Sequence, residues 1–284
     1  MRLTDLVSDL DAYFRVPDVE NDAAWYGDRE PYWRAYVEPE WVERRNGLMV
    51  RGDDEVERAA TCVFPSVRIV AGLEPRTLLF AEHPVDLEDE PGFLPLPQET
   101  FEAMKRERIS FYHVHGPLDQ HPEVSPSRPI AEGLGLLETE EYFPIVGGIP
   151  GGAAVIGESD LTLAELAERL RALLGSEIPV QVLSRPHAEA GRVAIAAGGG
   201  AQREILEASL ELGCRTYVTG NAATRCRLDF VREEVRDFHS LAREAGVAVV
   251  DGTHYGTEKL PQLAMTEWFR KRGLAAEFVP DGPK

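Results

Sequence analysis

The chain has 284 residues, 43% of them hydrophobic, which is enough to bury a sizeable core in one large domain or in two lobes. Its 30 basic and 49 acidic residues give a formal net charge of -19, which opposes binding to nucleic acid or to an anionic membrane, since both require clustered Lys and Arg. The three cysteines include no CxxC spacing, so neither a disulfide framework nor a zinc ribbon is indicated.

The first 14 residues have the spacing of an amphipathic helix. Their apolar side chains recur every three or four residues, at Leu3, Leu6, Val7, Leu10 and Phe14. A signal peptide would require a continuous apolar segment, and a membrane span would require about 18 apolar residues. We therefore expect an N-terminal helix, no membrane association and a cytoplasmic location.

Residues 15–45 are rich in proline, acidic and aromatic side chains, and contain Trp25, Trp33 and Trp41. Two interpretations are open. The rings belong to an irregular flap that packs on the core, or they form a subunit interface or lid, because Trp and Tyr are enriched at such contacts. A segment this apolar is not expected to lie bare on a monomer, so the sequence predicts a homo-oligomer.

From residue 59 onward, short apolar runs alternate with helical stretches. Runs at 59–64, 77–80 and 109–114 predict strands, and 98–106 predicts a helix. A middle section contains a predicted helix at 161–174 and a strand at 180–183, after which strands are expected at 192–197 and 216–218. This alternation predicts an α/β fold with an N-terminal lobe (1–136), a short middle unit (137–190) and a C-terminal segment (191–284).

Three predicted strands end in a histidine with a carboxylate nearby. In parallel α/β sheets, ligands collect beyond the carboxyl ends of the strands, so the joint placement predicts a shared metal site. Each pair by itself is more typical of a hydrogen-bonded histidine, and His254 with Glu258 is also typical of a helix cap. The three segments are Glu82 with His83, His115 with Asp119, and His254 with Glu258.

His254 and Glu258 follow the run that ends at Gly252. If a helix begins there, residues four apart lie on one face with Cβ atoms about 5–6 Å apart, close enough to reach one cation. Three further glycines, Gly198 to Gly200, separate a predicted strand from a predicted helix. They either cradle a phosphate on backbone N–H groups or allow the helix and strand to pack closely.

Five blocks of the chain match a known pattern, namely Asn46-Gly47-Leu48, Leu79 to Pro84, His115 to Asp119, Val193 to Thr219-Gly220, and His254 to Glu258. In this order, they resemble the Nif-three-like (NGG-one-interacting-factor-three-like) dinuclear metal-centre family, some members of which are named GTP cyclohydrolase type-I-like. The match covers nearly the whole chain from about residue 46.

The resemblance implies a set of metal ligands and a fold. The implied ligands are Glu82, His83, Asp119, His254 and Glu258, and His115 is implied as a proton donor or as a partner of the ligands. The implied fold has two lobes, with mixed or parallel sheets flanked by helices and the metal site in the cleft between the lobes. The implied assembly is a hexameric ring.

Two positions depart from the family pattern. The chain has Glu82-His83 where the family has two adjacent histidines, and Asn221 where the family has Asp after Thr-Gly. The first departure bears on the second metal, because a carboxylate favours Mn or Fe over Zn relative to an imidazole. Alternatively, Glu82 points to solvent or to an arginine, and one metal binds through His83, Asp119 and Glu258.

Imidazole and carboxylate ligands without a thiolate suit Zn, Mn or Fe at an open site. Two such cations activate a water molecule and clamp a phosphate or acyl oxygen. The sequence therefore predicts a hydrolase with two divalent metal ions, bridged by Asp119 and Glu258, with His83 and His254 as terminal ligands and His115 as the proton shuttle.

The expected substrate is a small molecule, with phosphate-bearing compounds and nucleotides as the first candidates and GTP as the runner-up through cyclohydrolase chemistry. An alternative from another class is a metal-binding oligomeric assembly that turns over nothing and has a regulatory or partner-binding role, since family membership does not fix function.

Overall fold

The computed structural model describes residues 1–18, 31–85, 95–185, 187–224, 226 and 228–280. The chain forms two compact units. The first contains the N-terminal part up to His121 together with the segment from Pro261 onward, and the second contains Pro122–Leu260. The boundary between them falls within helix α10 (His254–Lys271). The three-part division at residues 136 and 190 stays a prediction.

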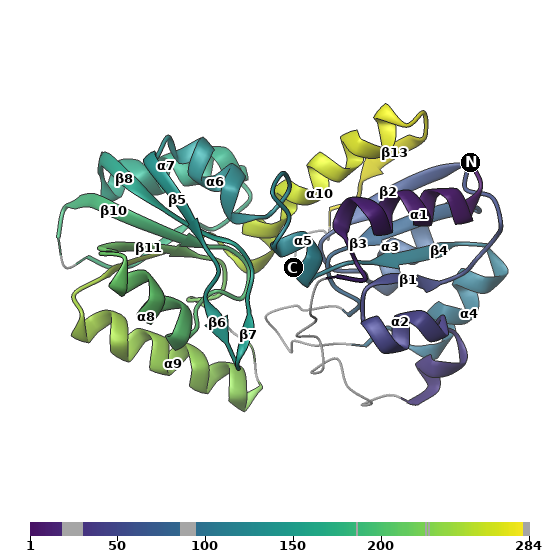
Figure 1. Cartoon of the computed structure of the whole chain (residues 1–284), viewed down its shortest axis with the longest axis horizontal. Helices are drawn as coiled ribbons and strands as arrows, with labels where there is room; N and C mark the ends of the chain where they lie inside the picture. Colours follow the sequence, from purple (N-terminus) through teal and green to yellow (C-terminus); the bar gives the residue numbers. More distant parts are fainter. Residues whose placement is uncertain (19–30, 86–94, 186, 225, 227, 281–284) are drawn as a thin grey trace. The chain divides into compact units, whose positions relative to one another are not determined.

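The first unit is built on a sheet with the strand order β1-β4-β3-β2-β13 (Figure 1). Its parallel part contains β13, β2, β3 and β4, and β1 runs antiparallel to β4. Three of these strands were predicted, whereas β1 and β13 were not. The bounds are β1 (Gly47–Val50), β2 (Arg58–Cys62), β3 (Thr77–Ala81), β4 (Ser110–His113) and β13 (Ala275–Phe278).

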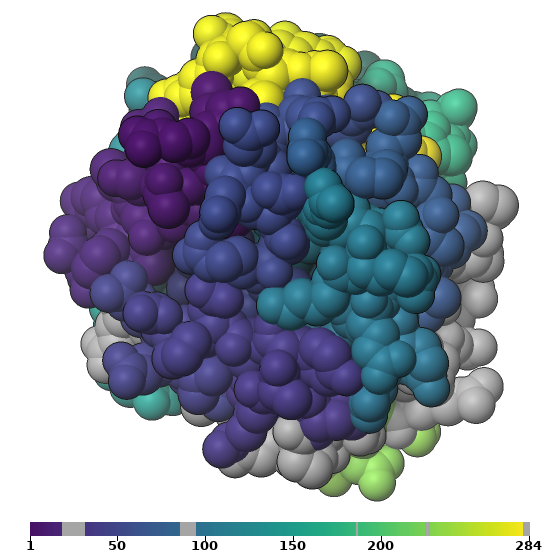
Figure 2. All heavy atoms as spheres, turned by 90° about the vertical axis from the view of Figure 1, so that its right-hand side faces the viewer, coloured from purple at the N-terminus to yellow at the C-terminus, as the bar shows by residue number. Residues whose placement is uncertain are grey.

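Helices cover both faces of this sheet. Leu79 and Phe111 belong to a core cluster on one face, whereas on the other face Phe80 stacks on Phe14 and contacts Phe269, each with ring centroids 5.8 Å apart. Figure 2 shows the C-terminal segment, in yellow, beside the purple N-terminal helix. The helices are α1 (Leu3–Phe14), η2 (Pro31–Ala35), α2 (Pro39–Arg44), α3 (Val67–Gly72), α4 (Gln98–Arg106) and α5 (Gly116–Asp119).

Two of the tryptophans in the aromatic segment are part of the core of the first unit. Trp33 and Trp41 are 8% and 2% exposed and belong to the cluster that contains Phe111. For these two rings, the interpretation as side chains packed on the core is confirmed, while Trp25 lies outside the described residues. The oligomer therefore stays a prediction, and these two tryptophans no longer support it.

The second unit is built on a six-stranded mixed sheet with the order β5-β8-β10-β11-β12-β9. Strands β10, β11 and β12 are parallel, and β8 and β9 flank them antiparallel. The bounds are β5 (Leu137–Tyr142), β8 (Ala154–Thr162), β9 (Gln181–Ser184), β10 (Glu189–Ala196), β11 (Thr216–Thr219) and β12 (Ala248–Asp251), with a separate hairpin of β6 (Ile145–Val146) and β7 (Ile149–Pro150).

Alternate side chains of this sheet pack against helices on its two faces. Ile195, Val218 and Val250 pack with α6 (Ser127–Leu134) and α7 (Leu163–Leu174), whereas the Tyr217 ring contacts Phe238 of α9 (Asp229–Glu244), beside which α8 (Arg203–Glu211) packs. The predicted α/β class, with mixed sheets flanked by helices, is confirmed. Among the described helices, none is long and apolar enough to cross a membrane.

Candidate metal centre

In the first unit, candidate ligands follow two neighbouring parallel strands. Ala81 of β3 pairs in register with His113 of β4, so the residues after these two strands leave the same edge of the sheet. The rings of His83 and His115 lie 4.9 Å apart, and His115 Nδ1 is 3.8 Å from Asp119 Oδ2. The first unit therefore brings three of the predicted site residues together.

Asn46 fixes the start of the α5 turn. The backbone N–H of His115 donates to Asn46 Oδ1 at 2.8 Å, and Asn46 is 2% exposed just before β1. Helix α5 places Asp119 four residues after His115, on the same face of the turn. The sequence marked Asn46 only through the resemblance, because a contact across 69 residues leaves no local pattern.

Glu82 is completely buried, and its Oε2 accepts a hydrogen bond from Gln262 Nε2 at 3.1 Å. The interpretation in which Glu82 points to solvent is therefore wrong. A buried carboxylate requires hydrogen-bond donors or a cation to offset the loss of hydration. The burial of Glu82 directly beside His83 suits a ligand of a cation.

Two other histidines near the candidate segments, His113 and His121, make hydrogen bonds to the protein that give each of them a structural role. Trp41 Nε1 donates to His113 Nδ1 at 3.1 Å, and burial, followed by the charges of His115 and His83, holds the pKa of His113 well below its ordinary value. His113 is therefore neutral and carries its proton on Nε2. His121 Nε2 is 3.0 Å from the Tyr13 carbonyl oxygen.

We expect Trp41→Phe to lower the free energy of unfolding by about 1–3 kcal/mol, because His113 Nδ1 would lose its donor in a buried place. Urea unfolding followed by circular dichroism measures this change. Trp33→Phe is the matched control, since that ring is also buried but donates no hydrogen bond among the described residues. Equal losses in the two variants would contradict a specific role for the hydrogen bond.

In the second unit, β12 leads directly into α10. Thr253 adopts a left-handed φ of 63°, and its Oγ1 accepts a hydrogen bond from the Gly256 N–H in the first turn of the helix. His254 Nε2 lies 2.9 Å from Glu258 Oε1, which confirms that the two side chains share one helix face. The distance is that of a hydrogen bond between the two side chains. Two donor atoms bound to one cation at about 2.0–2.2 Å and at right angles are also about 3 Å apart, so a cation could take the place of the proton between them.

Gly198 lies directly against the Glu258 carboxylate. Its φ is +60°, and a Cβ at this position would lie 1.9 Å from Glu258 Oε1. The Gly198 N–H donates to Thr257 Oγ1 at 2.9 Å, so it is already engaged by the protein. Gly198 therefore allows the Glu258 carboxylate to approach the backbone, a contact different from the close packing of helix on strand expected from the sequence, and these contacts do not favour a phosphate cradle.

Side-chain oxygens accept hydrogen bonds that connect the loops after β10, β11 and β12. Asn221 Oδ1 accepts from the Ala201 N–H at 2.8 Å, and Asp251 Oδ2 accepts from the Ala223 N–H at 3.0 Å. Asp251 Oδ1 also accepts from the Thr253 N–H at 2.9 Å. Asn221 therefore holds a loop in place, which an amide oxygen does as well as the Asp that the family has there.

Comparison with known proteins agrees with the fold and the candidate ligands. A family profile for Duf34/NIF3 (NGG1p interacting factor 3) matches residues 36–279. The chain belongs to the Duf34/NIF3 family. In the structure, three of the residues predicted as ligands, His83, His254 and Glu258, offer imidazole and carboxylate atoms that could hold a metal ion.

Curated relatives in the family have one recurring name. Proteins called "GTP cyclohydrolase 1 type 2 homolog" are 27% identical in Haemophilus influenzae over 242 residues and 29% identical in Deinococcus radiodurans over 238 residues. Each match covers 82% of this chain, and it covers 88% and 81% of the two relatives, respectively.

Solved structures support the fold assignment. Protein ybgI, whose function is unknown, has a TM-score of 0.68 at 20% identity, and TTHA1606 from Thermus thermophilus has a TM-score of 0.66 at 23% identity. Both alignments cover 100% of this chain and 99% of the other chain. At these identities, the similarity shows the fold alone.

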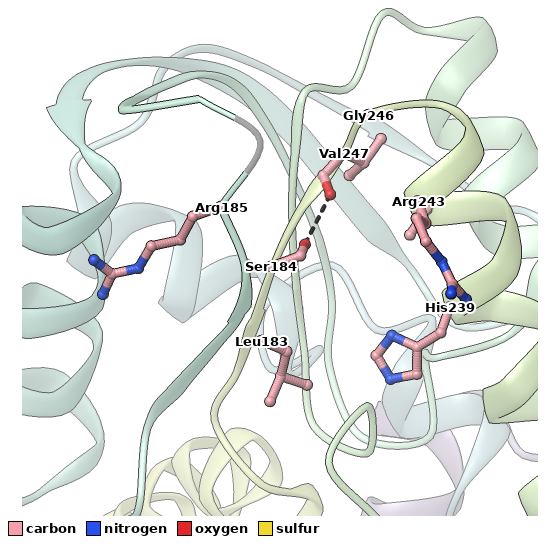
Figure 3. Close-up of a pocket in the computed structure, with 8 residues that line it drawn as sticks. Leu183, Ser184, Arg185, His239, Arg243, Gly246 and Val247 are labelled. Atoms are coloured by element: carbon pink, nitrogen blue, oxygen red, sulfur yellow. Dashed lines mark hydrogen bonds between the residues drawn. The ribbon is translucent and has the colours of Figure 1, made fainter.

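A pocket of about 500 Å³ lies between β9 and α9 of this Duf34/NIF3 protein (Figure 3). It is lined by Leu183, Ser184, Arg185, His239, Ala242, Arg243, Gly246 and Val247, and so by none of the predicted site residues. The Arg185 side chain points away from His239 and Arg243, and His239 Nε2 bonds the Ala222 carbonyl oxygen at 2.8 Å. These contacts do not form a converging ligand site.

The three cysteines are free and buried. Burial raises the pKa of the Cys214 thiol to about 12, so at pH 8 only about one thiol in 10⁴ is ionised. We expect Cys214 in the native protein to resist iodoacetamide at pH 8 and to react once the chain is unfolded in urea, as followed by peptide mass spectrometry. Rapid labelling of the native protein at Cys214 would contradict this.

Proposed function

We propose that this Duf34/NIF3 protein binds two divalent metal ions, of Zn, Mn or Fe, through Glu82, His83, Asp119, His254 and Glu258. The observation that carries the proposal is the His254 and Glu258 pair, whose donor atoms lie 2.9 Å apart at the carboxyl end of a parallel strand. Support also comes from the first unit, where His83, His115 and Asp119 follow parallel strands in the same way.

The chemistry of each side chain indicates its role among the proposed metal ligands. Asp119 and Glu258 each have two carboxylate oxygens and can bridge two cations, whereas the imidazoles of His83 and His254 each supply one nitrogen as terminal ligands. The set contains no thiolate, which suits an open site for hydrolysis rather than a closed structural zinc site. The proposed ligands then include the negative charges of Glu82, Asp119 and Glu258, which repel one another unless cations offset them.

We propose hydrolysis of a small substrate, with phosphate-bearing compounds and nucleotides as candidates. The two cations, when bound, would lower the pKa of a water molecule and polarise the phosphate or acyl oxygen of the substrate. His115 is the proposed proton carrier, supported by the hydrogen bond through which Asn46 fixes its backbone and by the 3.8 Å between its Nδ1 and Asp119 Oδ2. Its side chain is 13% exposed, so a substrate can reach it.

The test is turnover by metal-loaded protein on a panel of nucleotides that includes GTP, phosphoesters and cyclic amides. The relatives' name is the reason to include GTP. Asp119→Ala should abolish turnover without unfolding the protein, whereas Asp160→Ala, at an exposed aspartate, should not. Turnover that survives Asp119→Ala would remove this site from the mechanism.

The alternative function predicts a different result in the same assay. A metal-binding assembly with a regulatory role would bind metal with wild-type stoichiometry and turn over no member of the panel. We also propose a cytoplasmic homo-oligomer, hexameric by family resemblance. Light scattering tests the assembly, and a 31.5 kDa monomer at micromolar concentration would contradict it.

A further inference from the structure

We propose that Gln262 is a positioning residue that orients the Glu82 carboxylate as a metal ligand, with Oε2 held by the Gln262 amide and Oε1 turned to the cation. The inference rests on the proposed metal centre. It concerns a residue for which neither the family comparison nor the candidate ligand set has a role.

The contact between the two side chains is direct and buried. Gln262 Nε2 donates to Glu82 Oε2 at 3.1 Å, and both residues are 0% exposed. An amide N–H can only donate, so it fixes one carboxylate oxygen and with it the rotation of the whole carboxylate plane. A carboxylate held in this way binds a cation through its other oxygen, which is the arrangement in which an outer partner orients a ligand.

Gln262 is itself held in place. Its backbone carbonyl oxygen accepts hydrogen bonds from Thr61 Oγ1 of β2 and from Thr266 Oγ1 of α10, each at 2.9 Å. β2 pairs with β3, the strand that ends immediately before Glu82. The amide and the carboxylate are therefore both anchored to the same sheet, which gives the contact a fixed geometry.

Stability does not account for a glutamine at this position. Gln262 Oε1 is buried and accepts no hydrogen bond from the described residues, so half of the amide is unsatisfied. An unsatisfied buried carbonyl is costly, and a buried charge is costly as well, so an apolar pair of similar volume would be the more stable choice. A polar pair retained at this cost is typical of a functional site.

The pair also accounts for the departure from the family pattern. An imidazole ligand is oriented through its second ring nitrogen, whereas a carboxylate can rotate and bind through either oxygen. With Glu82 where the family has a histidine, the chain requires a donor that fixes the carboxylate. Gln262 follows Glu258 by four residues on α10 and supplies that donor.

The test is metal titration by calorimetry, together with the absorption spectrum of the Co²⁺-loaded protein. Gln262→Met, which keeps the volume and removes the donor, should weaken one of the two bound metals by about 10–100-fold and change the Co²⁺ spectrum. In a Glu82→His background, the same substitution should leave the affinity unchanged within about threefold, because the imidazole does not depend on the amide. Thr77→Val is the matched control, since it removes a hydrogen bond of a buried side chain in the same unit, to the Glu74 carbonyl oxygen, and Thr77 holds neither Gln262 nor Glu82.

The outcomes separate this inference from the proposed function. If wild-type protein binds two metals and Gln262→Met binds them equally well, Gln262 does not have the proposed role, although the metal centre itself is supported. An equal loss in the Glu82 and Glu82→His backgrounds would also overturn it, because Gln262 would then act by a general effect on the fold. Wild-type protein that binds no metal would remove both.

Discussion

Glu258→Gln is expected to weaken metal binding by more than about 100-fold, as measured by calorimetric titration of the metal-free protein. Loss of an outer partner of a ligand already costs about 10–100-fold, and Glu258 is proposed to touch the metal itself. The substitution keeps the shape of a side chain that is 3% exposed, and it removes the charge that faces His254. It should therefore leave the fold intact.

The matched control for this variant is Glu267→Gln, on the same helix. Glu267 is exposed and pairs with Arg270, so its charge is screened by solvent and contributes little. Metal affinity should be unchanged in this variant. Equal affinity in wild type, Glu258→Gln and Glu267→Gln would show that Glu258 is not a ligand.

Gly198→Ala is expected to reduce both stability and metal binding. A left-handed φ of +60° costs an alanine about 1–2 kcal/mol, and the added Cβ would lie 1.9 Å from Glu258 Oε1, so the carboxylate must move. We expect the unfolding free energy to fall by at least this amount and the metal stoichiometry to fall with it. Urea unfolding and elemental analysis of the same preparation measure the two effects.

The neighbouring glycine is a control for this variant. Gly199 lies outside the left-handed region, and a Cβ there would meet nothing within 4 Å. Gly199→Ala should therefore retain both stability and metal. If the two alanine variants behaved alike, the close approach of Gly198 to Glu258 would not be the reason for the glycine.

The sequence could predict the parts of the site that depend on local pattern. The run before Gly252 predicted a strand, the spacing of His254 and Glu258 predicted a shared helix face, and both are found. The same holds for the strands before His83 and His115, because short apolar runs between helical stretches are typical of a parallel sheet.

The parts that sequence reasoning missed depend on contacts between distant residues. Gln262 meets Glu82 across 180 residues, and Trp41 meets His113 across 72, and no periodicity links residues so far apart. Strand β13 pairs with β2 although the two lie at opposite ends of the chain. The sequence places Gly198 in a glycine run but does not show its contact, because Glu258, against which it lies, is distant along the chain.

The most direct test of the metal centre is anomalous scattering from crystals of the metal-loaded protein. The proposal predicts two peaks about 3.5–4 Å apart, with nitrogen and oxygen atoms of Glu82, His83, Asp119, His254 and Glu258 at about 2.0–2.2 Å. The absence of any peak bonded to these side chains, or metal held by other residues, would contradict it.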